Sequence, residues 1–167
     1  MTPDASARGT LRIRDFRPDD LEAAYELDQR CFEREIAYTR GQIRAFLARP
    51  GAIGLIAEWD GRLSGFAIGE WAGSRGHVVT IDVDASDRRR GAGKRLLAEL
   101  LRRLAAGGVR QVRLEVDLRN AAAIRFYERM GFREKRRLRD YYGPGLDGMR
   151  MVTDVQRRET PALQPPQ

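Results

Sequence analysis

Residues 78–94 (VVTIDVDASDRRRGAGK) join an apolar, β-branched run to a glycine-containing loop that opens an amphipathic helix. The apolar positions that follow recur at helical spacing and are Leu96, Leu97, Leu100, Leu101 and Leu104. Gly107 and Gly108 then predict the end of the helix. We therefore expect a strand, a loop and a long helix in this order.

The loop has the composition of an anion-binding site at a helix N-terminus. Its residues are Arg88, Arg89, Arg90, Gly91, Ala92, Gly93 and Lys94. Unpaired backbone N–H groups there favour an anion, and the two glycines allow a phosphate to approach the backbone closely. Two glycines also occur in ordinary strand-to-helix connections, but the adjoining arginines favour the phosphate. The spacing fits neither a P-loop nor a dinucleotide fingerprint.

Length and composition predict one domain over residues 1–155. The chain has 167 residues and no apolar run of the roughly 18 residues needed to cross a membrane. Residues 156–167 (QRRETPALQPPQ) are too polar and proline-rich to pack, so we expect a disordered tail. The start of the sequence has no secretory h-region, which predicts a cytoplasmic protein. The sequence leaves open whether it is a monomer or a homodimer.

The net charge of +7 raises the alternative of a small RNA-binding module without chemistry. Arginines cluster at residues 88–95 and 133–139, but aromatic residues for base stacking are missing from the first cluster, so nucleic acid is not the expected partner. A single cysteine, Cys31, and a single histidine, His77, do not suffice for a structural zinc cluster. We expect no metal, and we expect Cys31 to be a buried apolar residue.

The remaining patterns predict a mixed α/β structure. Helices are expected to begin at Pro18, at Thr39 with a capping box, and at Asn120. Strands are expected at 11–14, 53–59, 62–71, 77–83, 111–117, 132–142 and 149–155. Asp60-Gly61 predicts a tight hairpin between the second and third of these strands.

The loop matches the pattern [RQ]-x-x-G-x-[GA] at residues 88–93 and so resembles the acetyl-CoA signature of the GCN5-related N-acetyltransferases (GNAT). Within that superfamily the chain resembles ribosomal-protein N-terminal alanine acetyltransferases (RimI-like) and their archaeal and eukaryotic relatives. This closer resemblance rests on residues 76–83 (GHVVTIDV), 114–116 (LEV), 120–132 (NAAAIRFYERMGF) and 140–142 (DYY). It extends from about Leu11 to Val155.

The resemblance implies a central sheet of about seven strands with four helices, whose parallel pair splays apart at the centre. It implies direct attack of an amine on the thioester of acetyl-CoA. The cofactor would be held by Ile81, Asp82 and Val83, by the loop from Arg88 to Lys94, by Asn120 and by Tyr127. Glu115 would be the general base, directly or through water, and Tyr127 the acid that protonates the leaving thiolate.

The acceptor implied by the closer resemblance is the α-amine of a protein N-terminus, held by Tyr38, Glu35, Tyr141 and Tyr142. Polyamines, antibiotics and other small amines stay open, because enzymes that use them share the cofactor half. The segment Glu33-Arg34-Glu35 also stands where relatives often have a proline-containing substrate loop. From the residues alone, Tyr127 could be a core tyrosine, Glu115 a solvated strand residue, and Tyr141 and Tyr142 an edge-strand covering.

Overall fold

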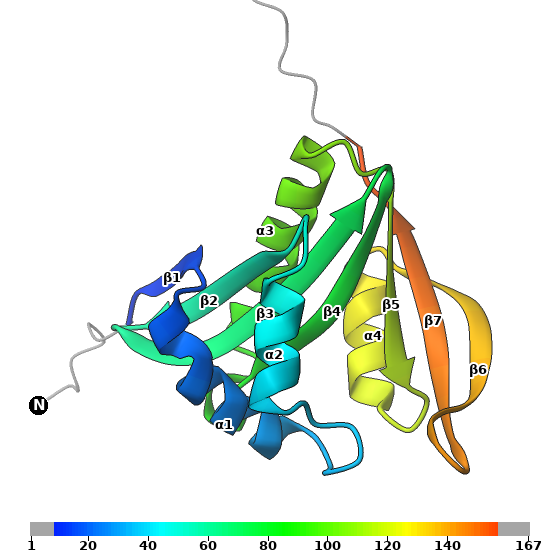
Figure 1. Cartoon of the computed structure of the whole chain (residues 1–167), viewed down its shortest axis with the longest axis horizontal. Coiled ribbons are helices and arrows are strands. Elements are labelled where there is room, and N and C mark those ends of the chain that lie inside the picture. The colour runs from blue at the N-terminus through cyan, green and yellow to red at the C-terminus, as the bar shows by residue number, and fades with distance from the viewer. Residues whose placement is uncertain (1–8, 157–167) are drawn as a thin grey trace, which may run out of the picture.

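The computed structural model describes residues 9–156, so the predictions for residues 1–8 and for the tail beyond Gln156 lie outside the described residues. Seven strands form one sheet, and four α-helices flank it (Figure 1). The strands are β1 (Leu11–Asp15), β2 (Ile53–Trp59), β3 (Arg62–Ala72), β4 (Arg75–Val83), β5 (Gln111–Asp117), β6 (Arg133–Gly143) and β7 (Leu146–Asp154). The helices are α1 (Leu21–Cys31), α2 (Arg40–Leu47), α3 (Ala92–Ala106) and α4 (Ala121–Arg129), with 3₁₀ turns η1 (Pro18–Asp20) and η2 (Ala85–Asp87).

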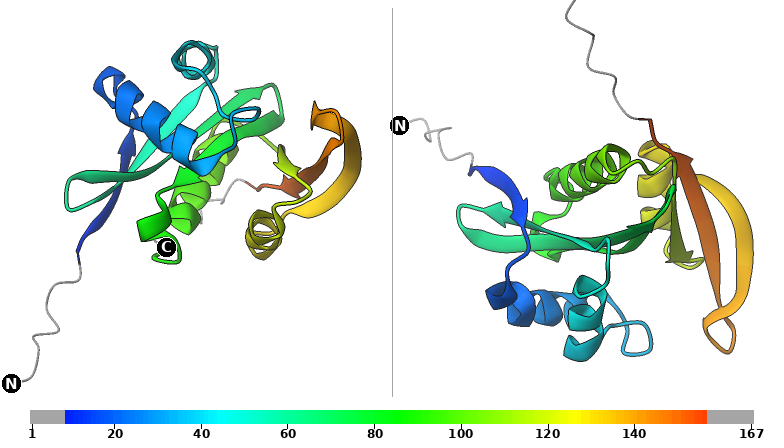
Figure 2. Two further views of the ribbon diagram at one scale, coloured as in Figure 1. Left: turned by 90° about the horizontal axis from the view of Figure 1, so that it is seen from below. Right: turned by 45° about the horizontal axis from the view of Figure 1, so that its top comes forward.

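The sheet has the order β1-β2-β3-β4-β5-β7-β6, and only the β4–β5 pair is parallel. Helices α1 and α2 lie on one face of its N-terminal half, whereas α3 and α4 lie on the other face (Figure 2). The predicted order of elements and the mixed α/β class are therefore confirmed. The parallel pair arises because α3 carries the chain from the end of β4 back to the start of β5.

Local sequence signals account for most element boundaries. Asp60 and Gly61 both have positive φ, 49° and 80°, as the predicted hairpin turn requires. The Thr39 side chain accepts from the Gln42 N–H, which confirms the capping box of α2. Strand β7 begins at Leu146, three residues earlier than predicted, because Leu146 pairs with Gly143 across a two-residue turn.

Two apolar clusters hold the layers together. Helix α3 packs Leu96, Leu97, Leu100 and Leu104 fully buried against the sheet, as its spacing predicts, whereas Leu101 is only half-buried. On the opposite face, α1 and α2 bury Ala24, Leu27 and Ile43 against Ile56, Phe66 and Ile68 of the sheet. The two clusters therefore pack against opposite faces of the sheet and fix the position of β4 between them.

Strands β4 and β5 part soon after they meet. Their pairing is limited to Arg75–His77 of β4 and Gln111–Arg113 of β5, and the strands diverge toward their C-terminal ends (Figure 1). The register between β3 and β4 also shifts at this point, because Ile68 pairs with Thr80 and Gly69 with Val78, leaving Val79 as an extra residue. Such a bulge bends the strand locally. The predicted splayed centre of the sheet is therefore confirmed.

Candidate active site

A cleft of about 470 Å³ occupies the opening between β4 and β5. It brings together seven of the residues predicted for a site, namely Tyr38, Ile81, Glu115, Asn120, Tyr127, Tyr141 and Tyr142. These residues come from the α1–α2 connection, from the two central strands, from α4 with its cap and from the end of β6. Residues separated by as many as 104 positions thus face one space.

Glu115 lines this cleft and is buried, with 5% of its side chain exposed. Its carboxylate lies 2.7 Å from His77 Nε2, accepts a hydrogen bond from Arg150 Nη2 at 3.0 Å and is paired with Arg113. Burial raises the pKa of the Glu115 carboxyl, but the contacts with His77, Arg113 and Arg150 outweigh it and leave the pKa below its ordinary value. Glu115 is therefore an ionised carboxylate among cations, not a solvated residue on an open strand.

His77 was not among the residues predicted for the site. Its Nδ1 is buried without a hydrogen-bond partner in the described part of the chain, and the nearest carboxylate oxygen recorded there is Glu70 Oε1 at 3.6 Å. The alternation of side chains along each strand is the sequence signal for His77. It places both His77 and Glu115 on the face of the sheet opposite to α3. Bringing the two together required the register of β4 against β5.

Tyr127 reaches the cleft from α4. Its ring packs against Phe126 and Phe132 at centroid distances of 5.3 and 5.8 Å. The hydroxyl makes no hydrogen bond to any described residue, and burial raises the pKa of Tyr127 above its ordinary value. The phenol therefore keeps its proton at neutral pH and is free to donate it. Asn120, at the start of the same helix, uses its side-chain oxygen to accept from the Ala123 N–H at 3.1 Å.

The glycine loop leads from the open end of β4 into α3. Gly91 is the N-cap residue of α3 and has a φ of 89°. Its carbonyl oxygen accepts a hydrogen bond from the Arg95 N–H. The N–H groups of residues 91–94 donate to no acceptor among the described residues. They are the unpaired donors that a helix N-terminus offers to an anion.

Two of the loop arginines are held by the protein. Arg90 donates to Asp87 Oδ1 at 2.8 Å and lies over the Trp59 ring, and Asp87, which is 1% exposed, also accepts from Arg62. Arg88 donates to the Val83 carbonyl at 3.2 Å and reaches the Cys31 sulfur. These contacts fix the loop. Among the described residues, its donors without a partner are the backbone N–H groups of residues 91–94 and the side chains of Arg89 and Lys94.

The side chain of Asp82 turns away from the cleft toward α1. It accepts from Thr80 Oγ1 at 2.7 Å and forms a carboxyl pair with Asp28, and burial raises the pKa of both acids. Any contact of Asp82 with a ligand in the cleft would therefore be through its backbone. Cys31 is half-buried at the cleft rather than fully buried as predicted, and burial raises its pKa to about 11, so it is a neutral thiol.

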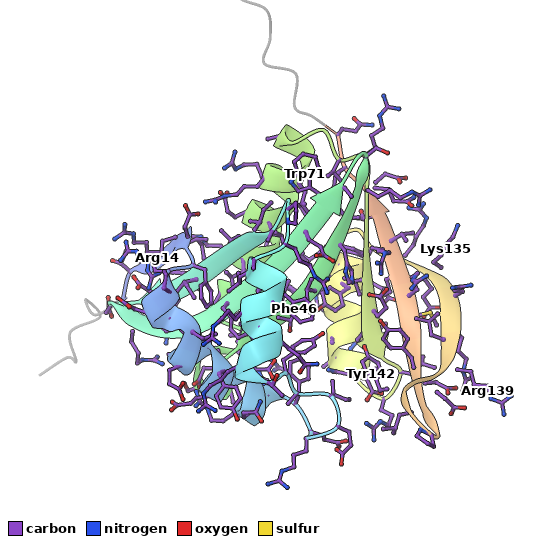
Figure 3. The ribbon with its side chains drawn as sticks, viewed as in Figure 1. Arg14, Phe46, Trp71, Lys135, Arg139 and Tyr142 are labelled. Atoms are coloured by element: carbon purple, nitrogen blue, oxygen red, sulfur yellow. The ribbon has the colours of Figure 1, made fainter. Side chains whose placement is uncertain are left out.

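Aromatic side chains also line the cleft. Tyr141 and Tyr142 pack edge to face at 4.9 Å, and Tyr141 is 48% exposed. Tyr142 lies near the lower end of the sheet, on the face that carries α2 and its Phe46 (Figure 3). Tyr38 packs against Phe46 at 5.0 Å, and its backbone N–H donates to Asp28 Oδ2 at 2.7 Å.

Glu35 does not line the cleft, although its neighbours Glu33 and Ile36 do. Arg119, which bridges Asp117 and Glu33, also lines it and was not predicted. Within residues 9–156, no group of three His, Cys, Asp or Glu side chains is placed to hold a metal ion. In the same residues, no helix combines the length and the apolar content needed to cross a membrane.

A mixed sheet that opens between its parallel strands, beside a glycine loop that begins a helix, is the architecture of an N-acetyltransferase. The chain belongs to the acetyltransferase (GNAT) family, whose model matches residues 21–132.

Among its relatives, an uncharacterised N-acetyltransferase of Methanocaldococcus jannaschii is 30% identical over 152 residues, covering 90% of this chain and 96% of that protein. The [ribosomal protein bS18]-alanine N-acetyltransferase of Escherichia coli K12 is 33% identical over 141 residues, covering 81% and 89%.

Solved structures agree with these sequence matches. The crystal structure of the ribosomal-protein-S18-alanine N-acetyltransferase from Escherichia coli superposes with a TM-score of 0.80 at 27% identity, covering 91% of this chain and 98% of that chain. Arabidopsis thaliana NAA60, solved with acetyl-CoA and with a bisubstrate analogue, gives a TM-score of 0.76 in both forms. The structure with acetyl-CoA is 25% identical, and the match covers 87% of this chain and 99% of that chain. The structure with the bisubstrate analogue is 26% identical, and the match covers 88% of this chain and 100% of that chain.

Proposed function

We propose that this N-acetyltransferase moves the acetyl group of acetyl-CoA to the α-amine of a protein N-terminus, in the cytoplasm. The observation that carries the proposal is that Glu115, an ionised carboxylate, lines one cleft together with Tyr38, Tyr141 and Tyr142. The resemblance to the bS18-alanine N-acetyltransferase supports the same acceptor.

Acetyl-CoA fits the residues on the loop side of the cleft. Its diphosphate would meet the unpaired N–H groups of residues 91–94, with Arg89 and Lys94 as additional cations. A Cβ built on Gly91 would meet no atom within 4 Å, so the surface outside the loop is open to a ligand. The pantetheine arm would then run between the parted strands along Ile81 and Val83 toward Glu115.

The reaction needs a base and an acid on opposite sides of the thioester. The acceptor nitrogen attacks the carbonyl carbon, a C–N bond forms and the C–S bond breaks. The proton of the amine passes to Glu115, directly or through a water, and the Tyr127 hydroxyl supplies a proton to the leaving thiolate. A backbone N–H near Val83 is proposed to stabilise the negative charge that develops on the carbonyl oxygen.

The energy of deprotonation favours an α-amine over a lysine. At pH 7, removing a proton from an α-amine with a pKa of about 7.7 costs roughly 1 kcal/mol, whereas a lysine with a pKa of about 10.4 costs roughly 4.6 kcal/mol. A carboxylate whose pKa is lowered by His77 and the two arginines is a weak base. It suits the first acceptor better than the second.

The test offers one peptide sequence with a free and with a blocked α-amine, each containing one internal lysine, together with spermidine. We expect acetyl transfer, followed by mass spectrometry, only at the free α-amine. Acetylation of the blocked peptide at its lysine, or a preference for spermidine, would refute the N-terminal acceptor and leave the acetyl-CoA site intact. Loss of all transfer in the presence of bound acetyl-CoA would refute the choice of these acceptors altogether.

A further inference from the structure

A second hollow, of about 340 Å³, lies on the sheet beyond Glu115 and is strongly basic. Its polar lining is Arg75 of β4, Gln111 and Arg113 of β5, Lys135 and Arg136 of β6, and Arg150 of β7. Five of these six side chains are cations and none is acidic. We refer to it as the basic hollow.

The charge of the basic hollow is only partly balanced. Arg113 and Arg150 are paired with Glu115, so two cations share one carboxylate. Arg75, Lys135 and Arg136 form no ion pair with any residue in 9–156 and are exposed. Asp154, at the end of β7, is bound to Gln111 and Arg133 and does not line the hollow. The five cations that line the hollow thus exceed the one carboxylate that pairs with them by four charges.

The basic hollow adjoins the active site. Arg113 and Arg150 line the hollow and contact Glu115, which lines the cleft, so the two spaces share a wall. Among the described helices, none covers β5, β7 and β6 on the face of α1 and α2 (Figure 2). Lys135 stands at the outer margin of this open surface on β6 (Figure 3). A substrate peptide with its terminal amine at Glu115 could therefore extend along this open surface.

We propose that the basic hollow binds an acidic segment of the acceptor polypeptide, a few residues after the terminal amine that is acetylated. This inference rests on the proposed N-terminal acceptor. Gln111 lies four residues before Glu115 in β5, which corresponds to about 13 Å at the rise of a strand. An extended peptide with its amine at Glu115 covers that distance in about four residues. Acidic side chains at positions three to five would reach the cations.

The two segments of the chain outside residues 9–156 do not match the hollow in charge. Residues 157–167 carry two arginines and one glutamate, and residues 1–8 carry one aspartate and one arginine. Neither segment supplies a run of acids. An RNA strand would complement the charge, but none of the residues in 9–156 that line the hollow is aromatic, so a base finds no ring there on which to stack. An acidic peptide is therefore the occupant that the lining favours.

The test compares three peptides with the same first two residues and a free α-amine, carrying at positions three to five either Asp and Glu, the matching Asn and Gln, or Lys. We expect kcat/KM to be about tenfold higher for the acidic peptide than for the neutral one at low salt, and lowest for the Lys peptide. The preference should shrink as salt rises toward about 0.5 M, because these cations are exposed.

Two triple variants separate the hollow from the overall charge. The hollow variant combines Arg75→Gln, Lys135→Gln and Arg136→Gln. It should bring the ratio of kcat/KM for the acidic peptide to kcat/KM for the neutral peptide close to one. The control variant combines Arg12→Gln, Arg17→Gln and Arg129→Gln. It removes the same charge from exposed positions elsewhere and should retain the ratio. Equal kcat/KM for the three peptides would overturn the inference and leave N-terminal acetylation standing. No acetylation of any peptide would overturn both.

Binding of a short single-stranded RNA provides the remaining comparison. If the hollow variant loses RNA affinity while its peptide ratio stays that of the unmodified protein, RNA is the occupant and the inference is wrong. If RNA binds equally to both triple variants, its binding is non-specific and the peptide ratio supports the inference.

Discussion

His77 Nε2 lies 2.7 Å from Glu115 Oε2, across the parallel strands just where their pairing ends. The contact joins His77, the last paired residue of β4, to Glu115, which lies just past the paired part of β5 and lines the cleft. It holds the Glu115 carboxylate toward the space where an amine and a thioester would meet. Because Arg113 and Arg150 bind the same carboxylate, its orientation is set by three side chains from three strands.

Glu115→Gln should lower kcat about 100-fold at pH 7, because an amide cannot take the proton of the amine. The loss should be smaller at about pH 9, where the acceptor amine releases its proton to solvent unaided. The measurement is kcat and kcat/KM across this pH range with a free α-amine peptide. Asp117→Asn, on the same strand and face, is the matched control and should retain the pH profile. A uniform loss at every pH would indicate a binding role for Glu115.

Tyr127→Phe should reduce turnover about 100-fold while the melting temperature stays within about 2 °C. The ring keeps its packing against Phe126 and Phe132, and no described residue loses a hydrogen-bond partner. Tyr25→Phe in α1 is the control, since Tyr25 lies under Arg40, away from the cleft lining. Unchanged turnover in Tyr127→Phe would remove the residue from the acid role.

Gly93→Ala should weaken acetyl-CoA binding at least tenfold without loss of stability. A Cβ at this position would meet Val83 and Phe126 at 3.5 and 3.6 Å, which is ordinary contact, so the folded protein accommodates it. The added methyl group would instead stand where a phosphate approaches the backbone. Calorimetric titration and a melting curve measure the two effects.

Gly91→Ala is the comparison variant for that experiment. Its Cβ would meet nothing within 4 Å, but φ is 89°, so the substitution should cost about 1 kcal/mol of stability through backbone strain. If Gly93→Ala binds acetyl-CoA as the unmodified protein does, the phosphates are bound elsewhere.

Asp82→Asn should make the stability less dependent on pH. Burial raises the pKa of Asp82 and of Asp28 above 3.8, so the folded protein keeps a proton that the unfolded chain has already released. Stability from this pair is full below about pH 4 and declines as pH rises toward the folded pKa values. We expect a melting temperature at pH 8 at or above that of the unmodified protein.

The side-chain amide that Asp82→Asn introduces could donate to Asp28 Oδ1, which is buried without a partner in the described residues. Asp19→Asn, at an exposed position, serves as the control. A melting temperature lowered equally at pH 4 and pH 8 would show that the Asp82–Asp28 pair has no raised pKa.

The sequence by itself determined the elements and the loop. Period-3.6 leucines specify α3, Asp60-Gly61 specifies a hairpin, and Thr39 with Gln42 specifies the start of α2, because each signal acts between residues close in the chain. The glycine–arginine run likewise identified the loop as a candidate anion site. Glu115 and Tyr127 entered the site through resemblance to a family, since strand and helix patterns alone leave them as ordinary residues.

Only the tertiary structure decided which side chains meet. His77 reaches Glu115 across 38 residues, and Asp28 meets Asp82 across 54, through the register and bulge of β4. It also showed that Arg88 and Arg90 are engaged by the protein and that the cations of the basic hollow come from four strands. These outcomes depend on strand pairing and on the parting of β4 from β5. Such long-range contacts are set by how the layers pack, and local periodicity does not encode that packing.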